Sequence, residues 1–232
     1  MINAILMASG MGTRMRPLTN YTPKPLIEVC GKPMIETIIE GLLQANVNII
    51  YIVTGYLREQ FNYLVEKYPN IHLIENTDYK TINNISSIYA AREVLKQEDC
   101  FICEADLYVS DPAIFSYKLS SSCYYGKMVE GHSDDWVFEQ DSTGVITRVG
   151  KTGDDCYNMV GVAFFKQREA EIIANAVEKR YRTDGYETLF WDDVVNENLD
   201  VLHLGIQPVN AEQIVEIDTV DELDEVNQRF SK

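Results

Sequence analysis

A glycine-rich loop follows the first apolar run of the chain, in the stretch MASGMGTRMRPLT, residues 7–19. The apolar run itself, residues 3–8, predicts a short buried β-strand. Because Gly10 and Gly12 come directly after it, backbone N–H groups of the loop can approach phosphate oxygens closely. The stretch therefore predicts a phosphate-binding loop at the end of the first strand, with a tight turn that carries solvated basic residues as the alternative.

Two better-known phosphate motifs do not fit this loop. A dinucleotide fingerprint requires a third glycine where the chain has Met15, and a P-loop requires Ser or Thr after its lysine, whereas the Gly-Lys pair at 31–32 is followed by proline. Two cations remain close to the loop, Arg14 and Lys24. Residues 1–32 hold four basic residues against one acidic residue, so positive charge is concentrated where phosphate would bind.

Charge and composition narrow the possible partners. The 232 residues include 36 Asp and Glu against 20 Lys and Arg, a formal net charge of -16, which does not suit binding to nucleic acid or anionic lipid. No run reaches the roughly 18 apolar residues of a membrane span, and residues 1–10 lack the features of a signal peptide. We expect a cytoplasmic enzyme or binding protein, monomeric or a small homo-oligomer, with neither nucleic acid nor a membrane as partner.

Apolar runs and helical patterns alternate through the first half of the chain, which predicts an α/β fold with a largely parallel sheet. After residue 123 the pattern changes to short alternating runs joined by the turn DSTG at 141–144, which predicts a hairpin. No linker or repeat interrupts the chain, so we expect one domain over residues 1–232. The expected strands are 3–8, 49–53, 71–75, 100–105, 136–139, 145–149, 158–165, 201–206 and 213–217, and the expected helices lie near 34–42, 57–68, 86–95, 169–181 and 220–230.

The five cysteines are odd in number, which argues against a disulfide framework. Cys100 and Cys103 form a CxxC pair, but they lie in a predicted strand, where the odd spacing sends the two thiols to opposite faces. We therefore expect buried structural thiols, with zinc or redox chemistry as the less favoured alternative.

The glycine loop is part of a longer pattern, G-x-GTR-x-x-PLT at 10–19 followed by PKPL at 23–26. This pattern resembles the signature of nucleotidyltransferases that activate phosphorylated sugars and alcohols with a nucleoside triphosphate. The resemblance implies a Rossmann-like nucleotidyltransferase sandwich with a mixed, mostly parallel central sheet and a small antiparallel section. Within that superfamily the chain is most similar to bacterial choline-phosphate cytidylyltransferases, through GYLREQF at 55–61, Asn83-Asn84, ADLY at 105–108, Trp136, Trp191-Asp192 and EID at 216–218.

The same resemblance implies roles for the first loop and its neighbours. The triphosphate would lie over the glycine loop, Lys24 would contact phosphate near the reacting centre, and Arg14 would hold the β- and γ-phosphates. Together with Asp106 these two cations are the expected catalytic residues. The residues expected to bind the nucleotide are Ala8, Ser9, Gly10, Gly12, Thr13, Tyr56 and Asn84.

Two aspartates follow apolar runs at the predicted sheet edge. Asp106 follows the strand at 100–105, and Asp218 follows the strand at 213–217. Two such carboxylates can share Mg²⁺ when phosphate oxygens and water complete its coordination, and the resemblance implies a magnesium ion on both. The alternatives are a turn residue for Asp106 and a helix N-cap for Asp218.

The acceptor expected from the resemblance is phosphocholine, with CTP as the donor of CMP. A quaternary ammonium has no N–H to donate, so a protein holds it with aromatic faces and nearby carboxylates. The expected pocket consists of Trp136, Trp191, Asp192 and Glu216, although Phe190 stands where the family often has tyrosine. Each tryptophan also has a purely structural interpretation, Trp136 in a hairpin and Trp191 in a helix core.

The expected reaction is in-line attack of a phosphate oxygen on the α-phosphate of CTP with loss of pyrophosphate. A phosphate monoester is already a competent anionic nucleophile near neutral pH, so catalysis reduces to positioning and cationic stabilisation. Other acceptors stay open: 2-aminoethylphosphonate or phosphoethanolamine, whose primary ammonium would bind carboxylates, and, less favoured, a sugar 1-phosphate. A non-catalytic nucleotide-sensing module is the alternative from another class, but binding alone does not require the combined set of Arg14, Lys24, Asp106 and Asp218.

Overall fold

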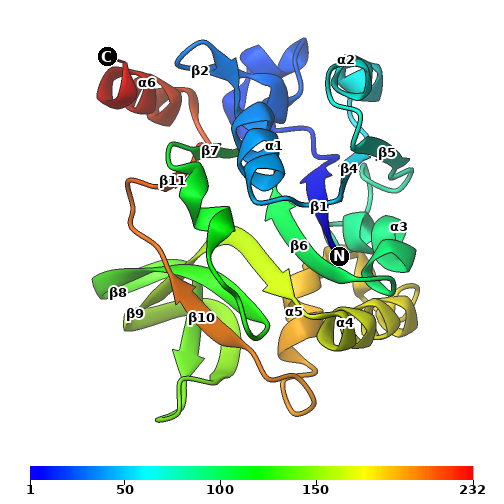
Figure 1. Ribbon diagram of the computed structural model, residues 1–232, viewed down its shortest axis with the longest axis vertical. Coiled ribbons are helices and arrows are strands. Elements are labelled where there is room, and N and C mark those ends of the chain that lie inside the picture. The colour runs from blue at the N-terminus through cyan, green and yellow to red at the C-terminus, as the bar shows by residue number, and fades with distance from the viewer. Residues whose placement is uncertain (232) are drawn as a thin grey trace.

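The parallel half of the central sheet carries the N-terminal loop. The computed structural model describes residues 1–231, and four of its strands run in parallel in the order β6 (Asp99–Glu104), β1 (Ile2–Ala8), β4 (Ile49–Thr54) and β5 (Ile71–Glu75) (Figure 1). Helices cover both faces of these strands, which is why their sequences are nearly continuous apolar runs. The four predicted strands are confirmed to within one residue at either end.

The other half of the sheet is a long antiparallel ribbon. β9 (Ile146–Phe165) pairs antiparallel with both β6 and β8 (Cys123–Gln140), and β10 (Gly205–Pro208) lies parallel to β8 at the edge. The predicted hairpin and the mixed, mostly parallel sheet are confirmed, but the prediction split the ribbon into short pieces. Its far part is exposed and interrupted by register shifts, so 130–135 and 151–155 show no alternation of apolar and polar residues.

Three further features differ from the predicted elements. The apolar pattern at 201–206 predicted a strand, but Leu202 and Leu204 are buried in a loop that precedes β10. The helix predicted over 57–68 does not begin at Leu57, because that residue has a positive φ of 49°. A 3₁₀ turn, Arg58–Phe61, follows it and leads into α2 (Asn62–Lys67). The sequence also gave no signal for β7 (Leu107–Val109).

Helices cover the two faces of the sheet and bury separate hydrophobic cores. One core packs under α1 and α2, and the other under α3, α4 and α5. Cys103 lies in the first core and Cys100 in the second, so the predicted opposite orientation of the two thiols is confirmed. None of the helices in residues 1–231 combines the length and apolarity needed to cross a bilayer. The remaining helix bounds are α1 (Met34–Gln44), α3 (Ile85–Leu95), α4 (Gln167–Arg180), α5 (Trp191–Asn196) and α6 (Val220–Phe230).

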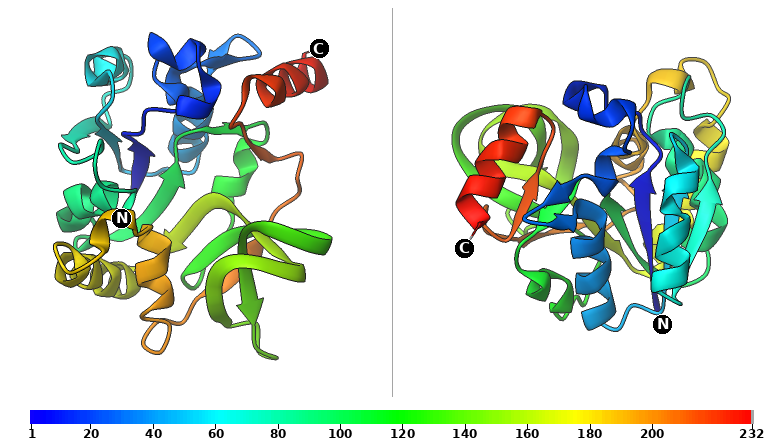
Figure 2. Two further views of the ribbon diagram at one scale, coloured as in Figure 1. Left: turned by 180° about the vertical axis from the view of Figure 1, so that it is seen from behind. Right: turned by 90° about the horizontal axis from the view of Figure 1, so that it is seen from above.

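A third, smaller core joins the two ends of the chain. Met15 and Met34 from the N-terminal segment pack with Ile217 and Leu223, and all four side chains are buried. Figures 1 and 2 show the red helix α6 beside the blue N-terminal segment that contains β2 (Glu28–Val29) and β3 (Lys32–Pro33). β11 (Ile214–Glu216) pairs antiparallel with β7 just before α6. This packing brings the carboxylates that follow β6 and β11 next to the glycine loop.

Candidate active site

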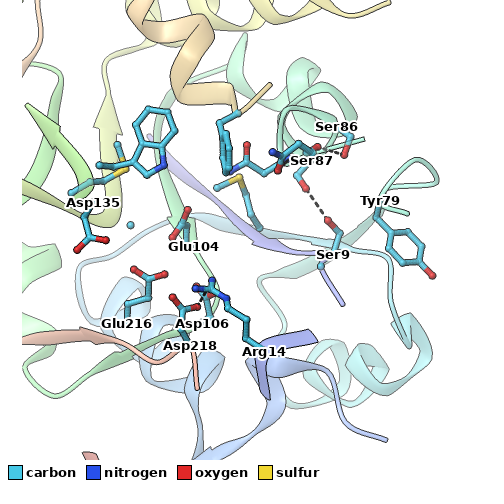
Figure 3. Close-up of a pocket in the computed structure, with 18 of the residues that line it drawn as sticks. Ser9, Arg14, Tyr79, Ser86, Ser87, Glu104, Asp106, Asp135, Glu216 and Asp218 are labelled. Atoms are coloured by element: carbon cyan, nitrogen blue, oxygen red, sulfur yellow. Dashed lines mark hydrogen bonds and ion pairs between the residues drawn. The ribbon is translucent and has the colours of Figure 1, made fainter. Parts of the chain in front are cut away.

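A cavity of about 500 Å³ opens where β1 and β6 end (Figure 3). In open α/β sheets this edge is the usual place for a ligand, because the loops that leave the strands frame a crevice there. The residues that line the cavity are Met7, Ser9, Gly10, Arg14, Tyr79, Ile82, Asn83, Asn84, Ser86, Ser87, Glu104, Asp106, Lys127, Asp135, Trp136, Lys151, Met159, Gly161, Phe190, Glu216 and Asp218.

The glycine loop forms one wall of this cavity through Ser9 and Gly10. Gly12 lies behind that wall with a positive φ of 58°. A Cβ at this position would lie only 2.9 Å from the Cβ of Lys24, so the loop can pass this close to Lys24 only because the residue is glycine. The loop is therefore fixed against the lysine that the sequence pattern paired with it.

Lys24 is the centre of a charged cluster that joins three segments of the chain. Its Nζ lies 2.6 Å from Asp106 Oδ2 and 2.6 Å from Asp218 Oδ1, and Arg14 Nη2 lies 2.7 Å from the same Asp218 oxygen. The Lys24 side chain is only 8% exposed, whereas that of Arg14 is 68% exposed and lines the cavity. The structure thus brings all four of these predicted residues together.

Electrostatics keep Lys24 and Asp218 ionised. Burial acts to lower the pKa of Lys24, but the two aspartates outweigh burial and hold that pKa above its usual value. In the same way, burial acts to raise the pKa of Asp218, and the contacts with Lys24 and Arg14 outweigh it and lower that pKa. Lys24 therefore carries a fixed positive charge near neutral pH, but it lies behind Asp106 and Asp218 and is not among the described residues that line the cavity.

Asp218 is not the N-cap of α6. Thr219 occupies that position, and its side-chain oxygen accepts a hydrogen bond from the Glu222 N–H. The N-cap interpretation of Asp218 is therefore wrong, and its carboxylate is left for the cations. A backbone hydrogen bond from Ile217 N–H to the Asp106 carbonyl ties the two aspartate segments together.

Carboxylates at the floor of the cavity fit a hard divalent cation. Glu104, Asp106 and Glu216 each place one carboxylate oxygen within 4.8 Å of the others. Asp106 Oδ1 is buried and has no hydrogen-bond partner among residues 1–231, so it has a free acceptor site. Desolvation, with the charges of Asp106 and Glu216, raises the pKa of Glu104 well above its usual range. A cation with oxygen ligands would relieve this repulsion, and Mg²⁺ has that preference.

A buried hydrogen-bond network holds the glycine loop against the start of α3. Asn76 Nδ2 lies 2.8 Å from Ser86 Oγ, 3.2 Å from Ser9 Oγ and 3.3 Å from Ser87 Oγ, and the hydroxyls of Ser9 and Ser87 lie 2.8 Å apart. All four side chains are buried. The network therefore connects the glycine loop to the start of α3 through one amide group.

An aromatic pair lies at the other end of the cavity. The rings of Trp136 and Phe190 meet edge to face, with centroids 5.3 Å apart, and both side chains line the cavity. Figure 3 shows the carboxylates of Asp135 and Glu216 facing the same end of the cavity as Glu104. This end can thus offer both aromatic faces and carboxylates to a small cation.

Two residues expected in the choline pocket are elsewhere. Trp191 is 3% exposed and packs against Tyr124 and Phe165 in the core, as its structural interpretation predicted. Asp192 is 2% exposed, accepts a hydrogen bond of 3.0 Å from the Tyr124 hydroxyl, and is absent from the lining formed by the described residues. Burial raises the pKa of Asp192 to about 7. The assignment of Trp191 and Asp192 to the choline pocket is therefore wrong. Both residues are buried in the core behind the residues that line the cavity.

The expected nucleotide-binding residues divide in a similar way. Asn84 lines the cavity, and its Oδ1 accepts a hydrogen bond from the Trp191 N–H at 3.0 Å. Tyr56 turns away from the cavity and donates its hydroxyl to the Thr19 carbonyl at 2.8 Å. Ala8 is buried at the end of β1, and Thr13 is exposed in the turn that follows Gly12, so in the part of the chain that the structure describes neither faces the cavity.

Several lining residues were not predicted. Glu104 had a usable signal, because an acidic residue ends an otherwise apolar buried strand two positions before Asp106. Asp135 had one as well, because it is an acidic residue directly before Trp136. Lys127 and Lys151 had none, since the ribbon that carries them was not recognised as one element.

Comparisons with known proteins agree with this geometry. Residues 3–135 match the family model described as nucleotidyl transferase. The chain is 55% identical over 221 residues to a 2-aminoethylphosphonate cytidylyltransferase from Lancefieldella rimae, which covers 95% of this chain and 90% of that relative. It is 33% identical over 221 residues to a choline-phosphate cytidylyltransferase from Streptococcus pneumoniae, with 95% of each covered. A solved structure of CTP:phosphocholine cytidylyltransferase from Streptococcus pneumoniae matches with a TM-score of 0.91 at 32% identity over 98% of both chains.

Asn76→Ala is expected to lower the free energy of unfolding by about 1–3 kcal/mol, because it leaves buried hydroxyls without their shared donor. Urea denaturation followed by circular dichroism measures the loss. Asn62→Ala, which removes an exposed amide on α2, is the matched control and should change stability by less than about 0.5 kcal/mol. Equal effects of the two variants would contradict a structural role for the buried network.

Asp192→Asn is expected to stabilise the protein above pH 7, by about 1–3 kcal/mol. The folded state holds a proton on Asp192 up to about pH 7, whereas unfolded aspartate loses it near about pH 3.9. Stability from this group therefore falls as the pH rises between those two values, and asparagine abolishes the fall.

Urea denaturation of wild type and Asp192→Asn from pH 4 to pH 8 measures this effect. The advantage of the variant should grow with pH and level off above about pH 7. Asp184→Asn, at an exposed aspartate, is the matched control and should not show this growing advantage. A flat difference for Asp192→Asn would contradict the burial of a protonated carboxyl.

Proposed function

The chain belongs to the nucleotidyl transferase family, and on that premise we propose that it is a cytidylyltransferase that transfers CMP from CTP to 2-aminoethylphosphonate. In this reaction an acceptor oxygen bonds to the α-phosphorus of CTP. The bond from that phosphorus to the bridging oxygen of the pyrophosphate group breaks, and pyrophosphate leaves with the electron pair. The product joins the CMP and phosphonate groups through one oxygen.

The observation that carries this proposal is the 55% identity, over 95% of the chain, to a relative named for that acceptor. The acceptor end of the cavity supports it independently. With Trp191 buried, one of the two expected tryptophans is left there, whereas Asp135, directly before Trp136, supplies a carboxylate. A primary ammonium can donate hydrogen bonds to carboxylates, and such charge-assisted bonds are about twice as strong as neutral ones.

The main problem of the reaction is repulsion between two anions, and the cations of the glycine-loop end address it. Lys24 is held rigidly between Asp106 and Asp218 and can stabilise charge on the phosphates without reorganising. Arg14, which is exposed and lines the cavity, can contact the β- and γ-phosphates as pyrophosphate leaves. Backbone N–H groups at Ser9 and Gly10 can contact the triphosphate as it lies over the loop.

The carboxylate cluster fits the magnesium ion expected for such a reaction. Asp106 would hold it together with Glu104 and Glu216, whose carboxylate oxygens lie within 4.8 Å of one another, and Asp218, which shares Lys24 with Asp106, would complete the set. When bound, Mg²⁺ neutralises charge on the phosphate oxygens and orients them. Lys24, which bridges the two aspartates, would keep them correctly placed.

Phosphocholine is the second candidate acceptor. The aromatic pair Trp136 and Phe190 favours it, because a quaternary ammonium binds to aromatic faces. The choline-phosphate relatives have the lower identity, 33% over the same length of chain.

The proposal predicts a definite order of acceptors. Pyrophosphate release from CTP and Mg²⁺ should be fastest, by kcat/KM, with 2-aminoethylphosphonate, lower with phosphoethanolamine and phosphocholine, and undetectable with glucose 1-phosphate. Phosphocholine as the best acceptor would overturn the choice of acceptor and keep the cytidylyl transfer. No release with any of these acceptors would contradict the proposed activity.

Asp106→Asn should lower kcat by about 10²- to 10³-fold, because it removes one charge from the cation site and keeps the side-chain shape. Activity should be measured across a titration of Mg²⁺, where the variant should also require more of the ion. Asp200→Asn removes an exposed aspartate far from the cavity lining and should leave kcat unchanged. Full activity of Asp106→Asn would rule out the assigned cation site.

A further inference from the structure

The aromatic pair in the cavity already has a cation beside it. Lys151 Nζ lies 5.3 Å from the centroid of the Phe190 ring and 5.7 Å from that of Trp136. Both distances are within the range of a cation–π interaction, about 6 Å. The lysine ammonium thus lies where a ligand's ammonium would have to lie to use the same aromatic faces.

The pairing of β8 with β9 places Lys151 beside the aromatic pair. Trp136 on β8 and Lys151 on β9 are directly opposed in the antiparallel ladder, so their side chains leave the same face of the ribbon. Phe190 is held above them at the start of α5, where its N–H donates to Asp193 Oδ2 at 2.8 Å. Neither rotation of the ribbon nor movement of α5 is needed to bring the three side chains together.

The ammonium group of Lys151 is not held by another residue from 1 to 231. Its side chain makes no ion pair and no hydrogen bond with any residue from 1 to 231, in a chain with a net charge of -16. Arg148, three positions earlier on the same strand, is paired with Glu139 at 2.6 Å. The aromatic faces are therefore the contacts that Lys151 makes with its charged group.

We propose that Lys151 is a specificity-determining residue that occupies the aromatic pair Trp136–Phe190 and so selects acceptors with a primary ammonium over acceptors with a quaternary ammonium. This inference rests on the proposed function and refines it. It explains how a cavity with an aromatic pair can favour an aminoalkylphosphonate: the aromatic faces are used internally, and the acceptor's ammonium is left to the carboxylates.

Repulsion between Lys151 and the acceptor does not itself discriminate, because both kinds of ammonium carry one positive charge. The difference lies in the contacts still open to each. A primary ammonium can donate three hydrogen bonds, and the carboxylate of Asp135, next to Trp136 in the chain, lines the same cavity as an acceptor. A trimethylammonium group can donate none, so it loses its main favourable contact when the aromatic faces are filled.

The test compares 2-aminoethylphosphonate with its N,N,N-trimethyl analogue, so that the reacting phosphonate is the same. The measured quantity is the ratio of kcat/KM for the trimethyl analogue to kcat/KM for 2-aminoethylphosphonate. Lys151→Ala should raise this ratio by about tenfold or more, mainly through a lower KM for the trimethyl analogue. Lys151→Arg, which keeps a cation that stacks on aromatic rings, should retain the wild-type ratio.

Lys118→Ala is the matched control, since Lys118 is exposed and lies outside the cavity lining. It removes the same charge and should leave the ratio unchanged. An unchanged ratio in Lys151→Ala, in an enzyme whose wild type uses 2-aminoethylphosphonate, would overturn this inference and leave the proposed function intact. A wild type that prefers the trimethyl analogue, or that does not use 2-aminoethylphosphonate, would overturn the proposed function and the inference with it.

Discussion

The buried ammonium of Lys24, shared between Asp106 and Asp218, is the interaction on which the site depends. Each carboxylate comes from a different part of the chain, and neither could be kept in a partly buried position without a counter-charge. Lys24 supplies that charge, and its own desolvation is offset by the same two contacts. The glycine loop, the end of β6 and the segment before α6 are thereby held in one arrangement.

Two other parts of the fold hold this charged cluster in place. The small core of Met15, Met34, Ile217 and Leu223 packs the C-terminal helix against the N-terminal segment and so brings Asp218 to Lys24. On the other wall, Asn76 joins the glycine loop to α3 through buried hydroxyls. The ion pairs of Lys24 and the buried hydrogen bonds of Asn76 thus fix the phosphate end of the cavity. The ribbon of β8 and β9 forms the acceptor end.

Sequence reasoning succeeded where a residue's role follows from its neighbours along the chain. The parallel strands and the glycine loop come from local patterns that burial enforces, whereas Lys24 and the two strand-end aspartates were chosen from the family resemblance, and their ion pairs with one another were not predicted. It failed where the role depends on a distant partner. The side chains of Trp191 and Asp192 could not be assigned to the core without knowing that Tyr124 lies beside them. Lys151 gave no signal, because its meaning comes from the cross-strand partner Trp136.

In the proposed reaction an acceptor phosphonate oxygen attacks the α-phosphate of CTP. Phosphorus NMR of the enzyme with CTP, Mg²⁺ and 2-aminoethylphosphonate follows every phosphorus atom of that reaction. This reaction should give equal amounts of pyrophosphate and of the CMP–phosphonate product. In the spectrum of that product a phosphonate resonance should be coupled to a phosphate resonance through one bridging oxygen. Release of CMP or CDP with an unchanged phosphonate resonance would contradict it.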